Sequence, residues 1–147
     1  MPVFNFKRMN NLPLTSPTIL KHYLLVRKWS SDIEFFNIET SFLHRLLDEY
    51  FLSLCNSDLI TELNITGERL LKLEKQQRNA TQAIRKQFLE MKWISTNMIR
   101  ESKNRITEAQ VNIGNLIAQV TFEFKEVKMD VFRLIEKQLQ KNRQLVL

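Results

Sequence analysis

The sequence predicts an all-α protein, built as an antiparallel bundle of three long helices that self-association can complete. Glycine and proline are scarce, with 2 and 3 among 147 residues, so the chain can form few turns and has to place its length in long elements. Apolar residues also recur at alternating steps of three and four positions, the spacing that keeps side chains on one face of a helix. A chain of this length fits a single domain.

The first predicted helix covers residues 17–55. It starts at Ser16-Pro17, because serine can cap the free N–H groups of a helix and proline fits its first position. Phe35, Phe42 and Leu46 are expected to widen the apolar seam of this helix into a bundle core. The seam consists of Val26, Trp29, Ile33, Phe36, Thr40, Leu43, Leu47, Tyr50 and Leu54.

The second predicted helix covers residues 58–98 and the third covers residues 104–143. Asn56, Ser57 and Asp58 form a short polar turn, which favours antiparallel packing of the first two helices. The seam of the second helix consists of Leu59, Leu63, Thr66, Leu70, Leu73, Gln77, Ala80, Ile84, Gln87, Met91, Ile94 and Met98. The seam of the third consists of Ile106, Gln110, Ile113, Ile117, Val120, Phe124, Val127, Val131, Leu134 and Gln138.

Two features argue against a perfectly regular helical reading. Val120-Thr-Phe-Glu-Phe124 alternates like a β-strand, but the seven-residue spacing continues on both sides of it, so we predict helix there. Gly67 lowers the stability of the second helix by about 1 kcal/mol relative to alanine. We therefore expect that helix to fray or to begin late in its first turns.

A second apolar group lies roughly opposite the seam of the third helix. It consists of Val111, Ala118, Phe122, Met129 and Phe132. One antiparallel neighbour cannot cover both faces of a helix, and an open apolar patch invites association. Either a second copy of the chain or the N-terminal arm, residues 1–16, covers this group. We expect the arm to be extended or disordered, and the partner to be the protein itself, as a homo-oligomer, or another helical protein.

Positive charge is concentrated in the second half of the chain. Residues 1–66 hold 6 Lys/Arg and 7 Asp/Glu, whereas residues 67–147 hold 16 and 9. Basic residues gather on the second helix away from its seam, where they could contact nucleic acid or an anionic membrane surface. These candidate polyanion contacts are Lys72, Lys75, Arg78, Arg85, Lys86 and Lys92. Few aromatic residues are interleaved with them, which favours the simpler interpretation that they keep the helix soluble.

The sequence carries no recognisable catalytic or cofactor chemistry. Neither His22 nor His44 has a glutamate three residues before it, as a di-iron bundle requires. Two glycines cannot form a phosphate-binding loop. We therefore predict no enzyme activity, catalytic residue, metal, cofactor or small-molecule substrate. A single cysteine, Cys55, and the lack of a signal peptide or an 18-residue apolar run predict a cytoplasmic protein.

The stretch WSSDIEFFNIETSFLHRLLDEYF, Trp29 to Phe51, resembles stretches of uncharacterised bacterial long-helix bundle proteins. The resemblance covers the first helix and implies a helical bundle, without a functional residue to carry over. The sequence as a whole predicts a non-enzymatic structural or protein-interaction bundle. The alternative is a binder of acidic polymers through the basic face of the second helix.

Overall fold

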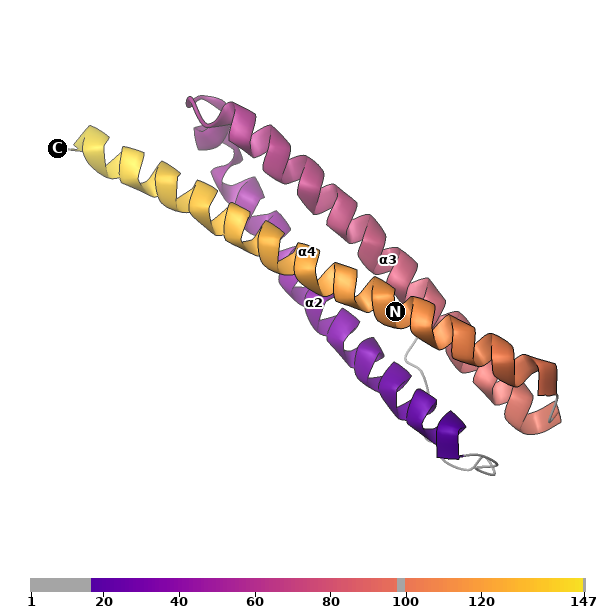
Figure 1. Cartoon of the computed structure of the whole chain (residues 1–147). Coiled ribbons are helices and arrows are strands. Elements are labelled where there is room, and N and C mark those ends of the chain that lie inside the picture. Colours follow the sequence, from indigo (N-terminus) through magenta and orange to yellow (C-terminus); the bar gives the residue numbers. More distant parts are fainter. Residues whose placement is uncertain (1–16, 98–99, 147) are drawn as a thin grey trace.

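The computed structural model describes the backbone of residues 17–97 and 100–146, and the side chains of residues 17–93 and 104–143. These parts of the chain form helices α2 (Pro17–Cys55), α3 (Ile60–Asn97) and α4 (Arg100–Val146), with no strand among them (Figure 1). The predicted all-α class and the three long helices are confirmed. The predicted N-terminal arm lies outside the described residues.

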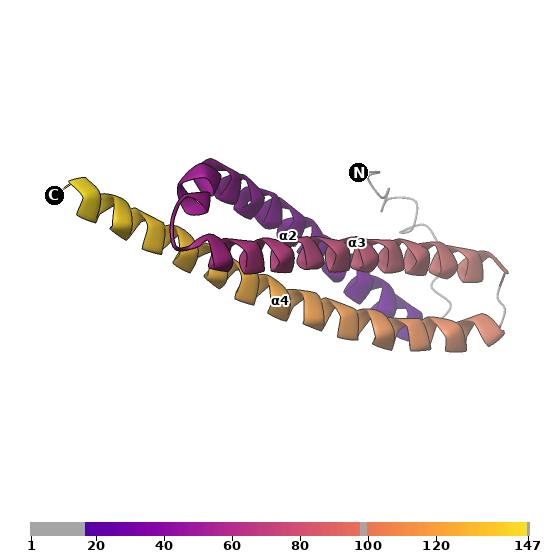
Figure 2. The ribbon, with the colours of Figure 1, turned by 90° about the horizontal axis from the view of Figure 1, so that it is seen from above.

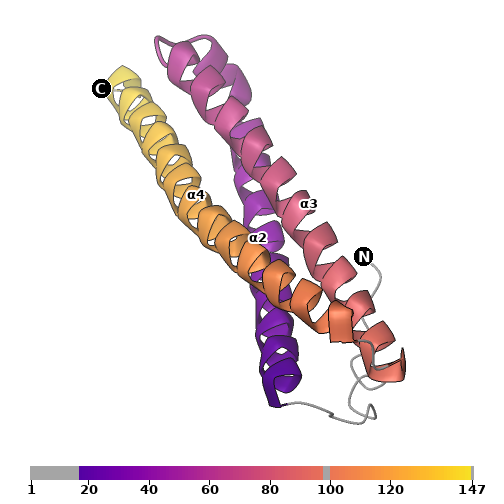
Figure 3. The ribbon, with the colours of Figure 1, turned by 45° about the vertical axis from the view of Figure 1, so that its right-hand side comes forward.

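The three helices run up, down and up, so that α2 and α4 point the same way and α3 runs antiparallel to both (Figure 1). Each helix contacts the other two. Figure 2 shows α3 and α4 nearly side by side, with α2 crossing this pair obliquely. In Figure 3, α2 lies behind and between the other two helices. The seams of all three helices therefore meet along one shared core.

The turn between α2 and α3 is fixed by one serine. The Ser57 hydroxyl donates to the carbonyl of Leu54 at 2.9 Å and accepts from the N–H of Leu59 at 3.1 Å. It therefore satisfies a carbonyl at the end of α2 and a free N–H at the start of α3. Among the three polar residues that predicted this turn, Ser57 is the cap.

The predicted seams form the core. The seam positions within the described side chains are buried, apart from Trp29 and Tyr50, which are half-buried and pack against the core. The expectation that Phe35 and Phe42 widen the core was wrong, since these side chains are 55% and 47% exposed. Each lies one residue before a buried one, and one residue turns a helix by about 100°, enough to carry the side chain out of the core.

Glycine has different consequences at its two positions. Helix α3 begins at Ile60, well before Gly67, so the expected late start does not occur. A Cβ on Gly67 would meet no atom within 4 Å. A Cβ on Gly114 would lie 3.4 Å from the ring of Trp29, in van der Waals contact, so Trp29 of α2 packs directly over this position of α4. The segment from Val120 to Phe124 is helical, as the seven-residue spacing predicted.

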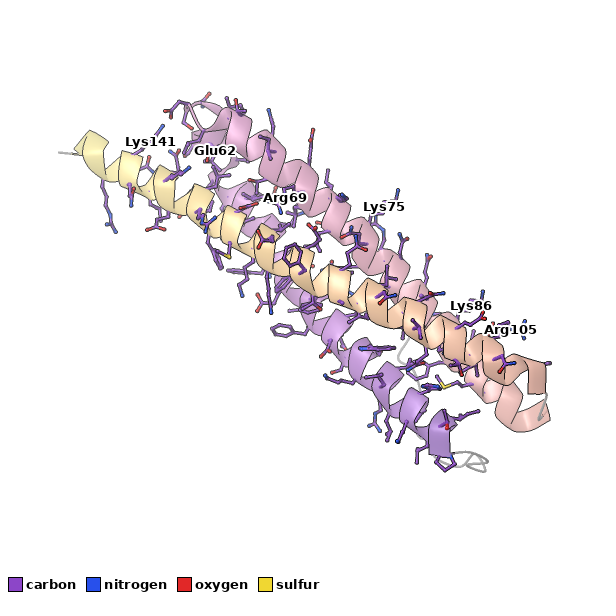
Figure 4. The ribbon with its side chains drawn as sticks, in the orientation of Figure 1. Glu62, Arg69, Lys75, Lys86, Arg105 and Lys141 are labelled. Carbon is purple, nitrogen blue, oxygen red and sulfur yellow. The ribbon has the colours of Figure 1, made fainter. Side chains whose placement is uncertain are left out.

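A ladder of ion pairs aligns α3 with α4. Glu62 pairs with Lys137 at 3.0 Å, and seven residues further along α3, Arg69 pairs with Asp130. Figure 4 shows Glu62 and Lys141 near the same end of this helix pair, with Arg69 further along it. Lys141 pairs with Asp58 in the turn before α3. From the first pair to the second, the chain advances seven residues along α3 and goes back seven residues along α4. The two ion pairs are therefore consistent with one antiparallel register.

Buried polar side chains join the helices by hydrogen bonds inside the apolar core. The Gln77 amide donates to the Thr40 hydroxyl at 2.8 Å, which joins α3 to α2. Further along, the Gln87 amide donates to Gln110 at 3.0 Å, and the Gln110 amide donates to the backbone carbonyl of His22 at 3.1 Å. These four side chains are at most 5% exposed. Buried hydrogen bonds of this kind favour one axial alignment over others, because a shift would leave polar groups unpaired.

Candidate interaction surfaces

The side of α4 that points away from the core is apolar and exposed. Val111 and Phe122 are 60% and 61% exposed, and Met129 and Phe132 are 47% and 43% exposed. Ala118 is also exposed. The five residues predicted for self-association therefore lie together on the surface of one helix. In Figure 1, α4 lies in front of α2 and α3, and neither of them covers it from that side.

Leu139 belongs to the same surface and was missed from the sequence. It is 40% exposed and follows Phe132 by seven residues, the spacing that separates Val111 from Ala118. Continuing the second apolar group by one repeat would have found it. We call Val111, Ala118, Phe122, Met129, Phe132 and Leu139 the outer face of α4.

Aromatic contacts through the core connect α2 with the outer face of α4. Phe35 packs against Phe36 with ring centroids 6.1 Å apart, and Phe36 packs against Phe124 of α4 at 4.8 Å. The ammonium group of Lys128 lies 5.7 Å from the ring centroid of Phe124 and 5.8 Å from that of Phe132. A line of contacts therefore joins the exposed Phe35 to the outer face of α4.

The exposed apolar side chains are unevenly distributed over the three helices. Of the large exposed apolar residues among the described side chains, α3 holds Ile65, Leu71, Leu89 and Trp93, while α2 and α4 hold the rest. Helix α3 instead carries most of the predicted basic contacts on its surface. Exposed apolar residues therefore occur on all three helices, and α2 holds the most of them among the described side chains.

The six predicted polyanion contacts do not form one site. Arg78 and Arg85 line a groove between α2 and α3, whereas Lys72, Lys75, Lys86 and Lys92 are exposed and do not line it. Figure 4 shows Lys75 and Lys86 on the side of α3 away from α4. The seven-residue spacing of Arg78 and Arg85 correctly placed them on one side of the helix.

The groove between α2 and α3 holds about 660 Å³ and is lined entirely by polar and charged side chains. Helix α2 adds Arg45 and His44 to the two arginines of α3, and Glu74 is the one acidic residue that lines the groove. Sequence reasoning missed Arg45 and His44, because only the pairing of the two helices brings them to the arginines. The buried Thr40–Gln77 pair also lines it.

His44 and Glu74 form a link across this groove. The Nδ1 atom of His44 lies 2.9 Å from a carboxylate oxygen of Glu74. This hydrogen bond raises the pKa of His44 above its ordinary value, burial opposes the rise, and the negative charges of Glu74 and Asp48 add to it. Protonation of His44 therefore strengthens the contact between α2 and α3.

The described residues bring no metal-binding chemistry together. Among the side chains that the structure places, no group of three or more His, Cys, Asp or Glu could hold a metal ion. Cys55 is the last residue of α2, is half-buried and forms no disulfide. None of the three helices, over its described length, carries an apolar stretch that could cross a membrane.

No family model, curated protein or solved structure matches this chain. The interpretation of its surfaces consequently depends on their geometry and chemistry. The resemblance of the first helix to bacterial long-helix bundle proteins stays a prediction.

Proposed function

We propose that this protein is a non-enzymatic structural or protein-interaction module that associates with itself through the outer face of α4. The observation that supports this most is the exposure of apolar side chains at seven-residue spacing along that face. This spacing is the pattern by which one helix recognises another. Contiguous exposed apolar patches on a protein surface often mark sites of association.

The composition supports the same proposal. The sequence contains neither a glycine-rich phosphate-binding loop nor a paired Glu-x-x-His ligand set. A reducing setting such as the cytoplasm is part of the proposal, because the chain has one cysteine and cannot form an internal disulfide framework.

The test is the solution mass of a Phe122→Glu variant. A carboxylate in the centre of an apolar contact surface loses its hydration without gaining a partner, so the variant should dissociate. Leu89→Glu is the matched control, because Leu89 is 59% exposed on α3 and lies outside the outer face. We expect Phe122→Glu alone to lower the mass while both variants keep the helical content of the wild type. Equal masses for both variants and the wild type would contradict the proposal.

A second candidate function is the binding of a polyanion, nucleic acid or an anionic membrane surface, in the groove between α2 and α3. Its support is the convergence of Arg45, Arg78 and Arg85 on a groove with one carboxylate. Guanidinium groups bind phosphate through paired hydrogen bonds and are favoured at such sites.

Binding of a single-stranded oligonucleotide and of phosphatidylserine vesicles by Arg78→Gln tests this candidate. Lys75→Gln removes the same charge from α3 outside the groove and is the control. A loss of binding confined to Arg78→Gln would support the groove. Equal losses in both variants would point to total charge alone and would refute a groove site.

A further inference from the structure

The outer face of α4 contains two oppositely charged residues in the same rows as its apolar residues. Lys125 lies seven residues from both Ala118 and Phe132, and Glu136 lies seven residues after Met129. Both charged side chains are exposed. The face therefore has two rows at seven-residue spacing, each interrupted by one charge. The first row is Val111, Ala118, Lys125, Phe132 and Leu139, and the second is Phe122, Met129 and Glu136.

An identical antiparallel helix can satisfy every one of these positions from Phe122 to Leu139 at once. In a two-fold pair, a residue of one row faces a residue of the other row on the second copy. When the two-fold axis passes between residues 130 and 131, Lys125 faces Glu136. The same register places Phe122 against Leu139 and Met129 against Phe132. Each of these three contacts occurs twice in the dimer, because the two-fold axis relates the two copies.

Neighbouring registers lose this match. A shift of one copy by seven residues in one direction places Lys125 against Met129. The same shift in the other direction places Glu136 against Phe132. Both shifts bury a charge against an apolar side chain, which is costly without a compensating partner. The sequence of the outer face thus distinguishes one antiparallel register from its neighbours.

We propose that a second copy of this chain docks antiparallel on the outer face of α4, in the register that pairs Lys125 with Glu136 of the other copy. This inference rests on the proposed self-association and gives it a geometry. The occupant is a second copy because the part of the face from Phe122 to Leu139 is complementary to itself in both apolar and charged positions, while Val111 and Ala118 lie beyond the paired stretch.

Helix α2 adds apolar surface at the centre of this pairing. Glu39 pairs with Lys128 at 3.5 Å, which fixes the relative levels of the two parallel helices. Three residues further along both helices lie Phe42 and Val131, beside the position of the two-fold axis. Phe42 is 47% exposed, although it is a large aromatic residue. Phe42 therefore offers exposed apolar surface on α2 near the level of the two-fold axis.

A charge exchange tests the register. Either single variant, Lys125→Glu or Glu136→Lys, places residues of like charge opposite each other at positions 125 and 136, twice in the dimer. Each variant should therefore raise the dissociation constant of the dimer about tenfold or more. The double variant restores opposite charges in both layers and should return the constant to within about threefold of the wild type. The constants are measured by sedimentation at low salt, where charge interactions are least screened.

Cross-linking gives a second, independent readout in a Cys55→Ser background. Residues 122 and 139 are 17 positions apart, about 25 Å along a helix, and a disulfide requires Cα atoms within about 7 Å. A mixture of Phe122→Cys and Leu139→Cys chains should therefore cross-link between the two variants. Phe122→Cys chains alone should stay unlinked.

The outcomes separate the register from the proposed function. A wild type that dimerises, with rescue by the double variant and cross-links between positions 122 and 139, supports the register. A dimer in which the double variant is as weak as the singles, or in which Phe122→Cys links to itself, overturns the register and leaves self-association intact. A wild type that stays monomeric overturns both.

Discussion

The hydrogen bond between Gln77 and Thr40 gives a sharp prediction about how polar groups act in this core. The Gln77 amide donates to the Thr40 hydroxyl at 2.8 Å, and the two residues are 3% and 2% exposed. Thr40→Val keeps the shape of the side chain but removes the acceptor. The amide of Gln77 is then left in the core without that partner.

The expected size of the effect follows from opposing contributions. An unsatisfied buried donor costs about 1 to 3 kcal/mol. The added methyl group of valine returns about 0.8 kcal/mol through burial. Thr40→Val should therefore lower the free energy of unfolding by about 0.2 to 2 kcal/mol. Gln77→Leu should cost less, because a threonine hydroxyl in a helix can donate to the carbonyl four residues back. The double variant should be close to the wild type.

Urea denaturation of the wild type, the two single variants and the double variant measures the coupling free energy between the two positions. All four are compared at one protein concentration, since association makes apparent stability depend on concentration. We expect a coupling of about 1 to 2 kcal/mol. A coupling below about 0.3 kcal/mol would refute the argument, because the two side chains would then act independently.

Further predictions concern the core, a glycine and a histidine. Leu43→Asp should abolish cooperative thermal unfolding, because Leu43 is 0% exposed and a buried unpaired charge costs about 4 kcal/mol or more. The control is Ser41→Asp, which lies on the exposed side of the same helix and should melt like the wild type. Gly67→Ala should raise the free energy of unfolding in urea by up to about 1 kcal/mol, since nothing obstructs the new methyl group, and an unchanged value would contradict this. The raised pKa of His44 adds stability that is fully present below about pH 6.5 and is lost as the pH rises through the folded-state pKa. His44→Gln should therefore cost up to about 1 kcal/mol at about pH 5.5 and less at about pH 8.5, and equal costs at both would count against the His44–Glu74 link.

The helices and their buried faces could be predicted from the sequence, because burial in a bundle follows helical spacing. The bounds of α2 agree with the prediction, and every predicted seam residue of α4 is buried. Ile135 is also buried and was not predicted. Even the strand-like segment from Val120 to Phe124 followed the spacing and not its local β propensity.

Features that depend on how two helices pair were not accessible in the same way. Phe35 and Phe42 were assigned to the core because aromatic residues next to a seam often widen it, but about half of each side chain is exposed. Arg45 and His44 join Arg78 only through the α2–α3 register. That register follows from contacts between residues more than thirty positions apart, such as Thr40 with Gln77, which one sequence does not reveal.

The exposed surface of α4 could be predicted from the sequence only in part. Spacing identified its five apolar residues, and the structure leaves them exposed. Spacing alone did not reveal that Phe35 of α2 connects to them through Phe36 and Phe124. This connection passes through the buried rings of Phe36 and Phe124, so it depends on how α2 packs against α4.

The most direct test of self-association is the solution mass of the wild-type protein, measured by light scattering between about 1 and 100 µM protein and between about 50 and 500 mM salt. We predict twice the chain mass of 17.6 kDa at the higher concentrations, and little change with salt because the outer face of α4 is mainly apolar. A mass of 17.6 kDa under all of these conditions would contradict the proposed function.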